Sequence, residues 1–337
     1  MLHQYIDRRS GVVRDERLFG DRLVNLIYSR VRENSPWLFR ALTSTRLSDL
    51  LGFVNYDLPL GNRLSGSQRF LQRLGVDLAE CLDAPETLNT ARKVFERRIR
   101  YWECRPMPQD PRAVVSPADA KVLVGALAGR MGFWLKNKFF TYEELLGTDK
   151  REWLHAFAGG DFAIFRLTPE KYHYNHAPVA GRVVDFYAID GACHSCNPGA
   201  VIELATPYSK NKRFVTVIDT DIPGGTGVGL VAMIEVVALM IGEVVQTYSD
   251  ERYDAPQPLQ LGMFLRKGVP KSLYRPGSST DVLLFQRGRI CFDDDIVTNM
   301  RRQGVASRFT RGFGVPLVET DLVVRSSIAR ARDSGDA

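Results

Sequence analysis

The sequence predicts an α+β fold in which a β-rich core follows a helical N-terminal region. Two observations lead to this prediction. Between residues 14 and 105 apolar residues recur at helical spacing, whereas beyond residue 105 short apolar runs of strand type alternate with clusters of Gly, Pro and Asn. We place the boundary at Arg105-Pro106-Met107-Pro108, which gives a helical region over 1–105, a β-rich core over 106–320 and a disordered tail over 321–337.

The helical region contains two groups of apolar residues with clear helical spacing. These are Leu18, Leu23, Leu26, Ile27 and Val31, and then Phe70, Leu71, Leu74, Leu78 and Leu82. A basic amphipathic helix is expected from Thr87 to Trp102. Its charged side is either a solvated face or a surface that contacts acidic lipid headgroups.

The core is expected to consist of short strands with few helices. The strand-like runs are Ala113 to Val115, Val122 to Val124, Phe162 to Leu167, Val183 to Ile189, Phe214 to Ile218, Leu230 to Val237 and Val282 to Phe285. Tyr142 to Leu146 carries a helical signal. Gly224 to Gly229 has the spacing GxGxG and not the GxGxxG of dinucleotide-binding loops, so we expect a flexible connection between strands.

The composition is that of a soluble globular protein, with 337 residues, 45% of them hydrophobic and 25% charged. The net charge of +6 suits an anionic partner. We find no nucleic-acid motif, and an anionic membrane surface fits the charge equally well. The five cysteines are scattered, which argues against a disulfide framework and favours a reducing cytosol. Neither a signal pattern nor a run of about 20 uncharged apolar residues is present, so we expect a soluble or surface-bound protein.

Two polar motifs in the core could carry chemistry. In Ser116-Pro117-Ala118-Asp119, the aspartate is either a turn-forming residue or a buried carboxylate that orients an imidazole. In Tyr172-His173-Tyr174-Asn175-His176, the two histidines could ligate a metal, play a structural part or act as acid and base. Pro178 favours a loop or strand end over a helix, and no third ligand is evident, so we predict no metal. The isolated Cys193-x-x-Cys196 pair is weak evidence for zinc or redox chemistry.

A third motif is the small-residue turn Pro276-Gly277-Ser278-Ser279-Thr280, directly before the apolar run that begins at Val282. By itself it is typical of an ordinary hairpin turn. It could equally hold a serine hydroxyl against a backbone carbonyl in a rigid setting.

Together these stretches are similar to the phosphatidylserine decarboxylase family, whose members make their own pyruvoyl group. The resemblance extends from about Tyr5 to Val315 and depends on the order and spacing of many short motifs. They are Phe19-Gly20-Asp21, Phe95-Glu96-Arg97-Arg98, Arg105-Pro106, Ser116-Pro117-Ala118-Asp119, Arg166-Leu167-Thr168-Pro169, Tyr172-His173 with His176, Asn197-Pro198, Asn211-Lys212-Arg213, Glu235-Val236 with Ala238 and Gly242, Gln246-Thr247-Tyr248, Lys267-Gly268 and the serine turn.

The resemblance implies that Asp119, His176 and Ser279 form a protease-like triad that cuts the chain once. Asp119 would orient His176, and His176 would take the proton of the Ser279 hydroxyl. An N-to-O acyl shift, β-elimination and hydrolysis would then leave a pyruvoyl group on the new fragment. Its ketone would form a Schiff base with the substrate amine and accept electrons as CO2 leaves. His173 would handle the proton at Cα, for which a pKa near neutrality is suitable.

The sequence departs from the family pattern at two positions. The family usually has Gly directly before the reactive serine, where this chain has Ser278. Counting back from Phe285 makes Ser279 the pyruvoyl precursor, whereas family members with a shorter turn would place it at Ser278 after Gly277. The second departure is Ala120, where the family typically has Gly after the aspartate, so the backbone there must tolerate a side chain.

The function implied by the resemblance is decarboxylation of phosphatidylserine to phosphatidylethanolamine. We expect a cytoplasmic protein bound peripherally to an anionic membrane, a homodimer, each unit a heterodimer of two self-cleaved fragments, with no nucleic-acid partner. One alternative is the same chemistry on a soluble amino acid, such as an aromatic one. The other is an uncleaved lipid-binding homologue, in which Ser278 and Ala120 prevent processing.

Overall fold

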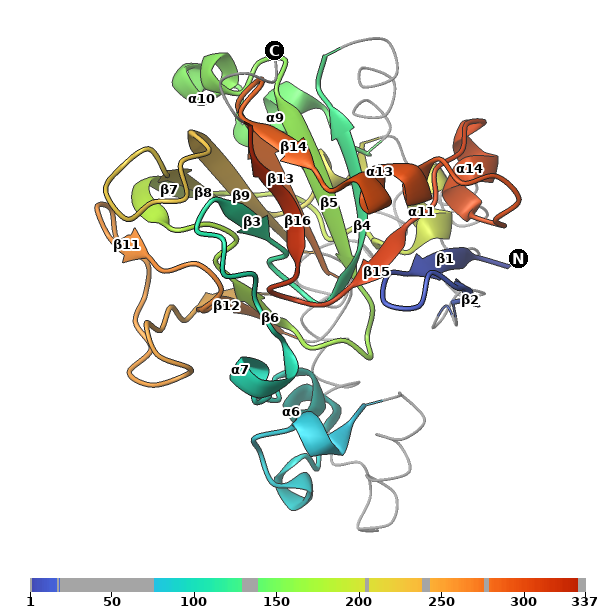
Figure 1. The fold of residues 1–337 in the computed structure, drawn as a ribbon, viewed down its shortest axis with the longest axis horizontal. Coiled ribbons are helices and arrows are strands. Elements are labelled where there is room, and N and C mark those ends of the chain that lie inside the picture. Colours follow the sequence, from blue (N-terminus) through green and yellow to red (C-terminus); the bar gives the residue numbers. More distant parts are fainter. Residues whose placement is uncertain are drawn as a thin grey trace.

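The computed structural model describes residues 2–16, 18, 76–128, 139–203, 206–237, 243–275 and 279–332. The strands in this part of the chain form three sheets, and the helices are short and lie around them (Figure 1). A β-rich core is therefore confirmed. Most of the predicted helical region, residues 19–75, lies outside the described residues.

The largest sheet has ten strands in the order β11-β7-β8-β9-β13-β5-β4-β15-β1-β2. Their bounds are β1 Gln4–Asp7, β2 Val13–Asp15, β4 Ala120–Ala126, β5 Asp161–Leu167, β7 Gly181–Ile189, β8 Arg213–Asp219, β9 Leu230–Val237, β11 Phe264–Leu265, β13 Ser279–Phe285 and β15 Thr320–Leu322. The pairing of β1 with β15 is parallel, and the other pairings in this sheet are antiparallel. All seven residues of β13 are buried, which explains why its sequence contains the continuous apolar run from Val282 to Phe285.

Two three-stranded sheets complete the core. One has the order β10-β12-β6, with β6 Tyr174–His176, β10 Val244–Gln246 and β12 Pro270–Tyr274. The other has the order β14-β16-β3, with β3 Ala113–Val115, β14 Ile290–Phe292 and β16 Ser327–Ala331. The first of these small sheets is the one that connects the histidine motif to the serine strand. In it β12 pairs with β6, and only four residues separate the end of β12 from the start of β13.

The predicted strands of the core all form. The glycine-rich stretch Gly224 to Gly229 connects β8 to β9, as expected, and Gly224, Gly227 and Gly229 adopt positive φ angles there. The helix predicted from Tyr142 to Leu146 is α9. Short apolar runs bounded by turn residues were therefore sufficient to locate these elements.

The helices of the described residues are short. They are the 3-10 turns η3 Leu78–Glu80 and η4 Pro85–Thr87, and the α-helices α6 Ala91–Phe95, α7 Tyr101–Cys104, α9 Tyr142–Leu146, α10 Arg151–Ala156, α11 Pro198–Glu203, α12 Pro207–Lys210, α13 Asp294–Met300 and α14 Arg308–Phe313. Helices α6 and α7 lie together at one end of the molecule, beneath β6 and β12 in Figure 1. Within the described ranges, none of the helices is long and apolar enough to cross a membrane.

The prediction of one basic helix from Thr87 to Trp102 is wrong. The chain leaves the helical conformation between α6 and α7, where Ile99 forms an isolated bridge with Cys81. The side chain of Arg97 is buried and donates to the carbonyls of Val94 and Glu170, and Arg98 pairs with Asp83 at 2.6 Å. Tertiary contacts of this kind override the helical periodicity of the sequence.

Both ends of the predicted core also need correction. Strands β1 and β2, inside the predicted helical region, belong to the large sheet, and strands of three or four residues are too short to show a period in the sequence. The predicted tail contains β16 and most of β15, and Ile328 is fully buried. Residues 321–332 are therefore part of the core, whereas 333–337 lie outside the described residues.

Candidate active site

His176 is the last residue of β6 and is fully buried. Its Nδ1 lies 2.9 Å from the carbonyl oxygen of Gly268, and its Nε2 lies 3.0 Å from the hydroxyl of Tyr172. A carbonyl can only accept, so Nδ1 carries the proton and Nε2 presents a lone pair. The imidazole thus has the tautomer that a general base requires at Nε2.

The environment of His176 keeps the ring neutral. Burial lowers the pKa of His176 to about 3, although the hydrogen bond to Gly268 acts in the opposite direction. Positive charge on Arg325 lowers the pKa further, and negative charge on Asp119 raises it. At neutral pH this histidine can accept a proton but has none of its own to give from Nε2.

Asp119 lies in the turn between β3 and β4, next to the histidine strand. The amide of His176 donates to the carbonyl of Pro117 at 2.7 Å, which joins this turn to β6. The carboxylate of Asp119 accepts two bonds from Arg105, from Nη2 at 2.8 Å and from Nε at 3.0 Å, and a third from the amide of Val324 at 2.8 Å. Burial opposes its ionisation, but the Arg105 guanidinium lowers the pKa of Asp119 below its usual range.

The structure therefore brings Asp119 and His176 close together without the hydrogen bond that a triad would have. In this conformation the orienting acceptor on Nδ1 of His176 is the carbonyl of Gly268. Gly268 has a φ of +75°, and a Cβ there would lie 2.4 Å from Sδ of Met107. A glycine at this position is what allows the carbonyl to reach the imidazole.

His173 is also fully buried, but its surroundings differ. Its Nδ1 lies 2.8 Å from the carbonyl of Lys171, and its Nε2 has no hydrogen-bond partner among the described residues. The ring packs against Phe95 of α6 with the centroids 4.7 Å apart. Burial lowers the pKa of His173 to about 3, so the expectation of a pKa near neutrality is wrong for this conformation.

Ser279 is the first residue of β13, between Leu167 of β5 and Val237 of β9. It is fully buried, and within the described ranges its Oγ makes no hydrogen bond. A buried hydroxyl without a partner is unusual and indicates a group available for another interaction. Ser278, the alternative position, lies outside the described residues.

Strand β12 connects the serine and the histidines. Pro270 at its start pairs with His176, and the amide of Tyr274 at its end donates to the carbonyl of His173 at 3.0 Å. The hydroxyl of Tyr274 lies 2.9 Å from the carbonyl oxygen of Thr280, the residue after Ser279. No hydrogen bond joins Ser279 directly to His176 in the described parts of the chain.

Sequence reasoning assigned no role to a group of tyrosines around His176. Tyr172 and Tyr253 join their hydroxyls at 2.7 Å, and Tyr253 also bonds to the backbone of Ile99. Tyr101 packs edge-on against the His176 ring with the centroids 4.7 Å apart. Tyr172 could have been found from the sequence, because it belongs to the histidine motif. Tyr101 and Tyr253 are distant from this motif in the sequence, and no pattern there indicates that they lie near His176.

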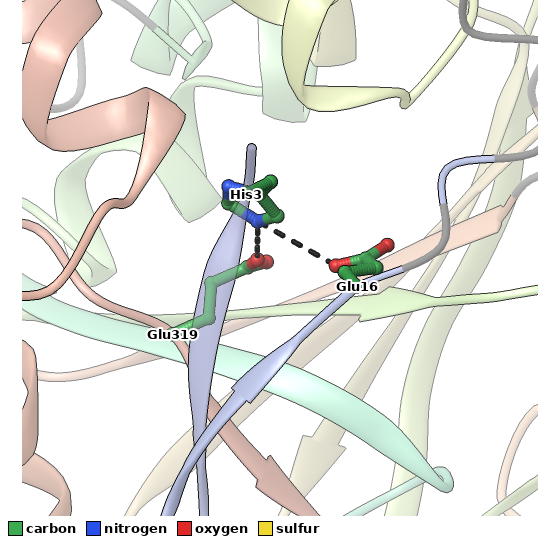
Figure 2. Close-up of side chains that lie close together, drawn as sticks. All are labelled: His3, Glu16 and Glu319. Carbon is green, nitrogen blue, oxygen red and sulfur yellow. Dashed lines mark hydrogen bonds and ion pairs between the residues drawn. The ribbon is translucent and has the colours of Figure 1, made fainter. Parts of the chain in front are cut away.

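A second cluster at the N-terminal hairpin contains possible metal ligands. In Figure 2, Nε2 of His3 faces the carboxylates of Glu16 and Glu319, and the ligand atoms of the three lie within 4.8 Å of one another. However, Arg166 donates to both carboxylates at 2.6–2.8 Å, and the amide of Arg308 donates to Nδ1 of His3. Nε2 must then carry the proton, so the arrangement fits an ion-pair network that fastens β1 and β2 to the core.

The Cys193-x-x-Cys196 pair lies in the core. Both cysteines are buried, and among the described residues neither forms a disulfide. Burial raises the pKa of Cys196 to about 12, which keeps it as an unreactive thiol at neutral pH.

Comparison with known proteins gives one consistent result. A sequence model of the family described as phosphatidylserine decarboxylase matches residues 91–309. A "Phosphatidylserine decarboxylase proenzyme" from Chlamydia trachomatis is 30% identical over 315 residues, which cover 91% of this chain and 95% of the relative. Proteins of the same name from Saccharophagus degradans and Fusobacterium nucleatum are 32% and 25% identical, over 68% and 89% of this chain and 80% and 93% of theirs.

Proposed function

The chain belongs to the phosphatidylserine decarboxylase family, which consists of carboxy-lyases, and from this premise we propose that it decarboxylates phosphatidylserine to phosphatidylethanolamine after cleaving itself at Ser279. The proposal rests on one observation, a pair of buried groups on β6, which pairs with β12, and on β13, which follows β12 in the chain. One is a neutral imidazole with its lone pair at Nε2, and the other is a serine hydroxyl without a partner among the described residues.

In the proposed self-cleavage, Nε2 of His176 takes the proton of the Ser279 hydroxyl. The Oγ atom attacks the carbonyl carbon of residue 278, and the peptide bond to the Ser279 nitrogen is exchanged for an ester. Loss of the Cα proton then breaks the Cβ–O bond, and the ester oxygen leaves as the C-terminal carboxylate of residue 278. The chain is thereby cut and a dehydroalanine remains, whose amine water converts to a ketone with release of ammonia. The Oγ of Ser279 is buried and has no hydrogen-bond partner among the described residues, which supports its role as the precursor of a pyruvoyl group.

The pyruvoyl ketone, once present, supplies an electron sink for the bond that joins Cα to the departing CO2. The residues of the chain then have to bind and orient the substrate amine and manage one proton at Cα. His173 is suited to the proton because its Nε2 has no partner in the described ranges and its ring is fixed by the bond to Lys171. Asp119 contributes negative charge near both histidines, since it raises the pKa of each against the effect of burial.

We further propose that the chain works at an anionic membrane surface, where a phospholipid substrate resides. The basic segment Thr87 to Trp102 is not a free cationic face, because Arg97, Arg98 and Arg100 are bound within the chain. A better candidate lies at strand β11, where Leu261 is 69% exposed and Phe264 is 38% exposed. Arg182, paired with Phe264, and Arg266 are exposed beside them, as suits anionic headgroups.

The test of cleavage is a denaturing gel with intact-mass analysis of the purified chain. Cleavage before Ser279 would release a C-terminal fragment of residues 279–337, which is 337 − 278 = 59 residues. Hydroxylamine should trap a ketone on this fragment, and S279A should remain a single chain. An unbroken wild-type chain without a trappable carbonyl would refute the proposed function, and a shift of one residue would assign the cleavage to Ser278.

The test of the substrate is CO2 release from vesicles that contain phosphatidylserine, compared with free amino acids. Release from free amino acids alone would favour the soluble-substrate alternative.

For the membrane surface, the variant L261E/F264E should bind anionic vesicles more weakly in cosedimentation than the wild type. Size measurement under native conditions should show both fragments together, and it will also test the expected homodimer.

A further inference from the structure

A pair of buried carboxyl groups lies beside the serine on the same face of the large sheet. Asp281 of β13 and Glu235 of β9 are direct cross-strand partners, and both are fully buried. Side chains alternate along a strand, so Ser279 and Asp281 share one face of β13. Thr280 points to the other face, toward Cys196 and Tyr208. The face of Asp281 is covered by the sheet β10-β12-β6.

Glu235 takes nearly all of the polar contacts on this face. Nζ of Lys271 lies 2.7 Å from its Oε2, and Gln246 donates to the same oxygen at 2.9 Å. Ser272 and Asn175 donate to Oε1. A carboxyl group that accepts four hydrogen bonds, one from a buried ammonium, is in its ionised form.

The remaining carboxyl, Asp281, then has no cation of its own among the described residues. One lysine faces two carboxyl groups in a buried site, and two adjacent negative charges there would be costly. Burial and the charge of Glu235 accordingly raise the pKa of Asp281 well above its usual range, although Tyr274 and Lys271 act against this. Of the two carboxyl groups, Asp281 is therefore the one whose surroundings favour the protonated form.

The contacts of Tyr274 support the same conclusion independently. Its hydroxyl lies 2.9 Å from the carbonyl oxygen of Thr280 and 2.8 Å from Oδ1 of Asp281. The phenol has one proton, and a backbone carbonyl can only accept, so Tyr274 donates to Thr280. A hydrogen bond across the second contact then requires that the proton come from Asp281. The result is a chain in which Asp281 donates to Tyr274 and Tyr274 donates to Thr280.

We propose that Asp281 is a positioning residue for cleavage at Ser279: as a neutral acid it directs the hydroxyl of Tyr274 onto the carbonyl of Thr280 and so fixes the backbone next to the serine. This inference rests on the proposed function. Its consequence is a sensitivity to base, because an ionised Asp281 would accept the hydrogen bond of the Tyr274 hydroxyl, which would then no longer donate to Thr280. The groups around Asp281 are Glu235 on β9, Lys271 and Tyr274 on β12, Asn175 on β6, Gln246 on β10 and the apolar Phe165 on β5.

The experiment follows self-cleavage of freshly synthesised full-length chain on denaturing gels, for wild type, D281N, D281V and Y274F. The D281N substitution keeps a neutral donor to Tyr274, so this variant should cleave close to the wild-type rate. D281V and Y274F lose the chain of hydrogen bonds and should cleave about tenfold more slowly or worse, as expected when an orienting contact is lost. Wild-type cleavage should also slow at alkaline pH, whereas D281N should not show this decline.

A second measurement does not depend on cleavage. In the uncleaved S279A chain, infrared spectroscopy should show the carbonyl band of a protonated carboxylic acid at neutral pH, and S279A/D281N should lack it. Absence of this band, or wild-type cleavage rates in both D281V and Y274F, would overturn the inference and leave the proposed function intact. If D281V does not fold, Y274F and the pH profile of D281N still decide. A wild-type chain that never cleaves would overturn both.

Discussion

The hydroxyl of Tyr172 lies 3.0 Å from Nε2 of His176, the ring nitrogen that must accept the proton of Ser279 in the proposed cleavage. Because Nδ1 is held by the carbonyl of Gly268, Nε2 has the one lone pair that the ring can offer. Tyr172 and Ser279 therefore compete for the same atom. In the structure His176 has the tautomer that a general base requires, but its Nε2 is already hydrogen-bonded to Tyr172.

Mutation can therefore distinguish the role of His176 from that of Tyr172. H176A should reduce self-cleavage about 100-fold or more, the typical contribution of a general base. Y172F should cleave at least as fast as the wild type, because Nε2 becomes free to accept from Ser279. The measurement is the rate of conversion of full-length chain on denaturing gels. A Y172F chain as inactive as H176A would instead make the tyrosine hydroxyl part of the reaction.

Gly268 should be needed for the orientation of His176 and not only for folding. G268A forces a side chain onto a φ of +75° and toward Sδ of Met107 at 2.4 Å, whereas G262A has a φ of +80° with nothing within 4 Å. G262A should lose about 1–2 kcal/mol of unfolding free energy from the left-handed backbone, and G268A should lose more because its side chain also meets Met107. Slower cleavage is expected for G268A alone. Denaturant unfolding in the S279A background and gel kinetics measure the two effects, and equal cleavage rates in both variants would contradict the role of this carbonyl.

Asp119 should act on stability through Arg105. D119N removes one partner of a buried ion pair whose side chains are 5% and 8% exposed, and this should cost about 3–5 kcal/mol of unfolding free energy. E80Q, at the more exposed carboxylate on the same arginine, is the matched control and should cost less. Chemical denaturation of the uncleaved S279A chain gives both values. A D119N chain of wild-type stability that fails to cleave would show that the carboxylate acts on His176 instead.

The parts of this picture that the sequence predicts are those set by local pattern. The strand from Leu230 to Val237 and the helix from Tyr142 to Leu146 form with the predicted bounds, because their apolar runs and flanking turn residues are sufficient to define them. The expected strand end at the histidine motif is β6, for the same reason. Its neighbour in space, β12, follows almost a hundred residues later in the sequence, and neither segment alone indicates the pairing.

The remaining features depend on register and burial between distant segments. The pairing of Asp281 with Glu235 requires the register of β13 on β9, which nothing in either strand reveals alone. The hydrogen bonds of Asp119 with Arg105 and of His176 Nδ1 with the carbonyl of Gly268 likewise arise from tertiary packing. A pKa near neutrality was expected for His173 because the sequence gives the residue type but not its burial.

The buried histidines should make the fold sensitive to acid. Burial lowers the pKa of both His173 and His176 from the usual 6.5 to about 3. Below pH 6.5 the unfolded chain binds a proton at each residue that the folded chain does not, so their contribution to stability is complete above pH 6.5 and is lost as the pH falls toward 3. Each histidine should contribute a slope of about 1.4 kcal/mol per pH unit within this window.

In the S279A background, H173N should therefore reduce the pH dependence of the unfolding free energy between about pH 6 and 5 by about that amount, measured by denaturant titration. H155N, at an exposed histidine on α10, serves as the control for a histidine-to-asparagine substitution. A slope that is the same with and without His173 would mean that this ring is protonated in the folded state, and its proposed role in handling the Cα proton would then have to begin from the charged form.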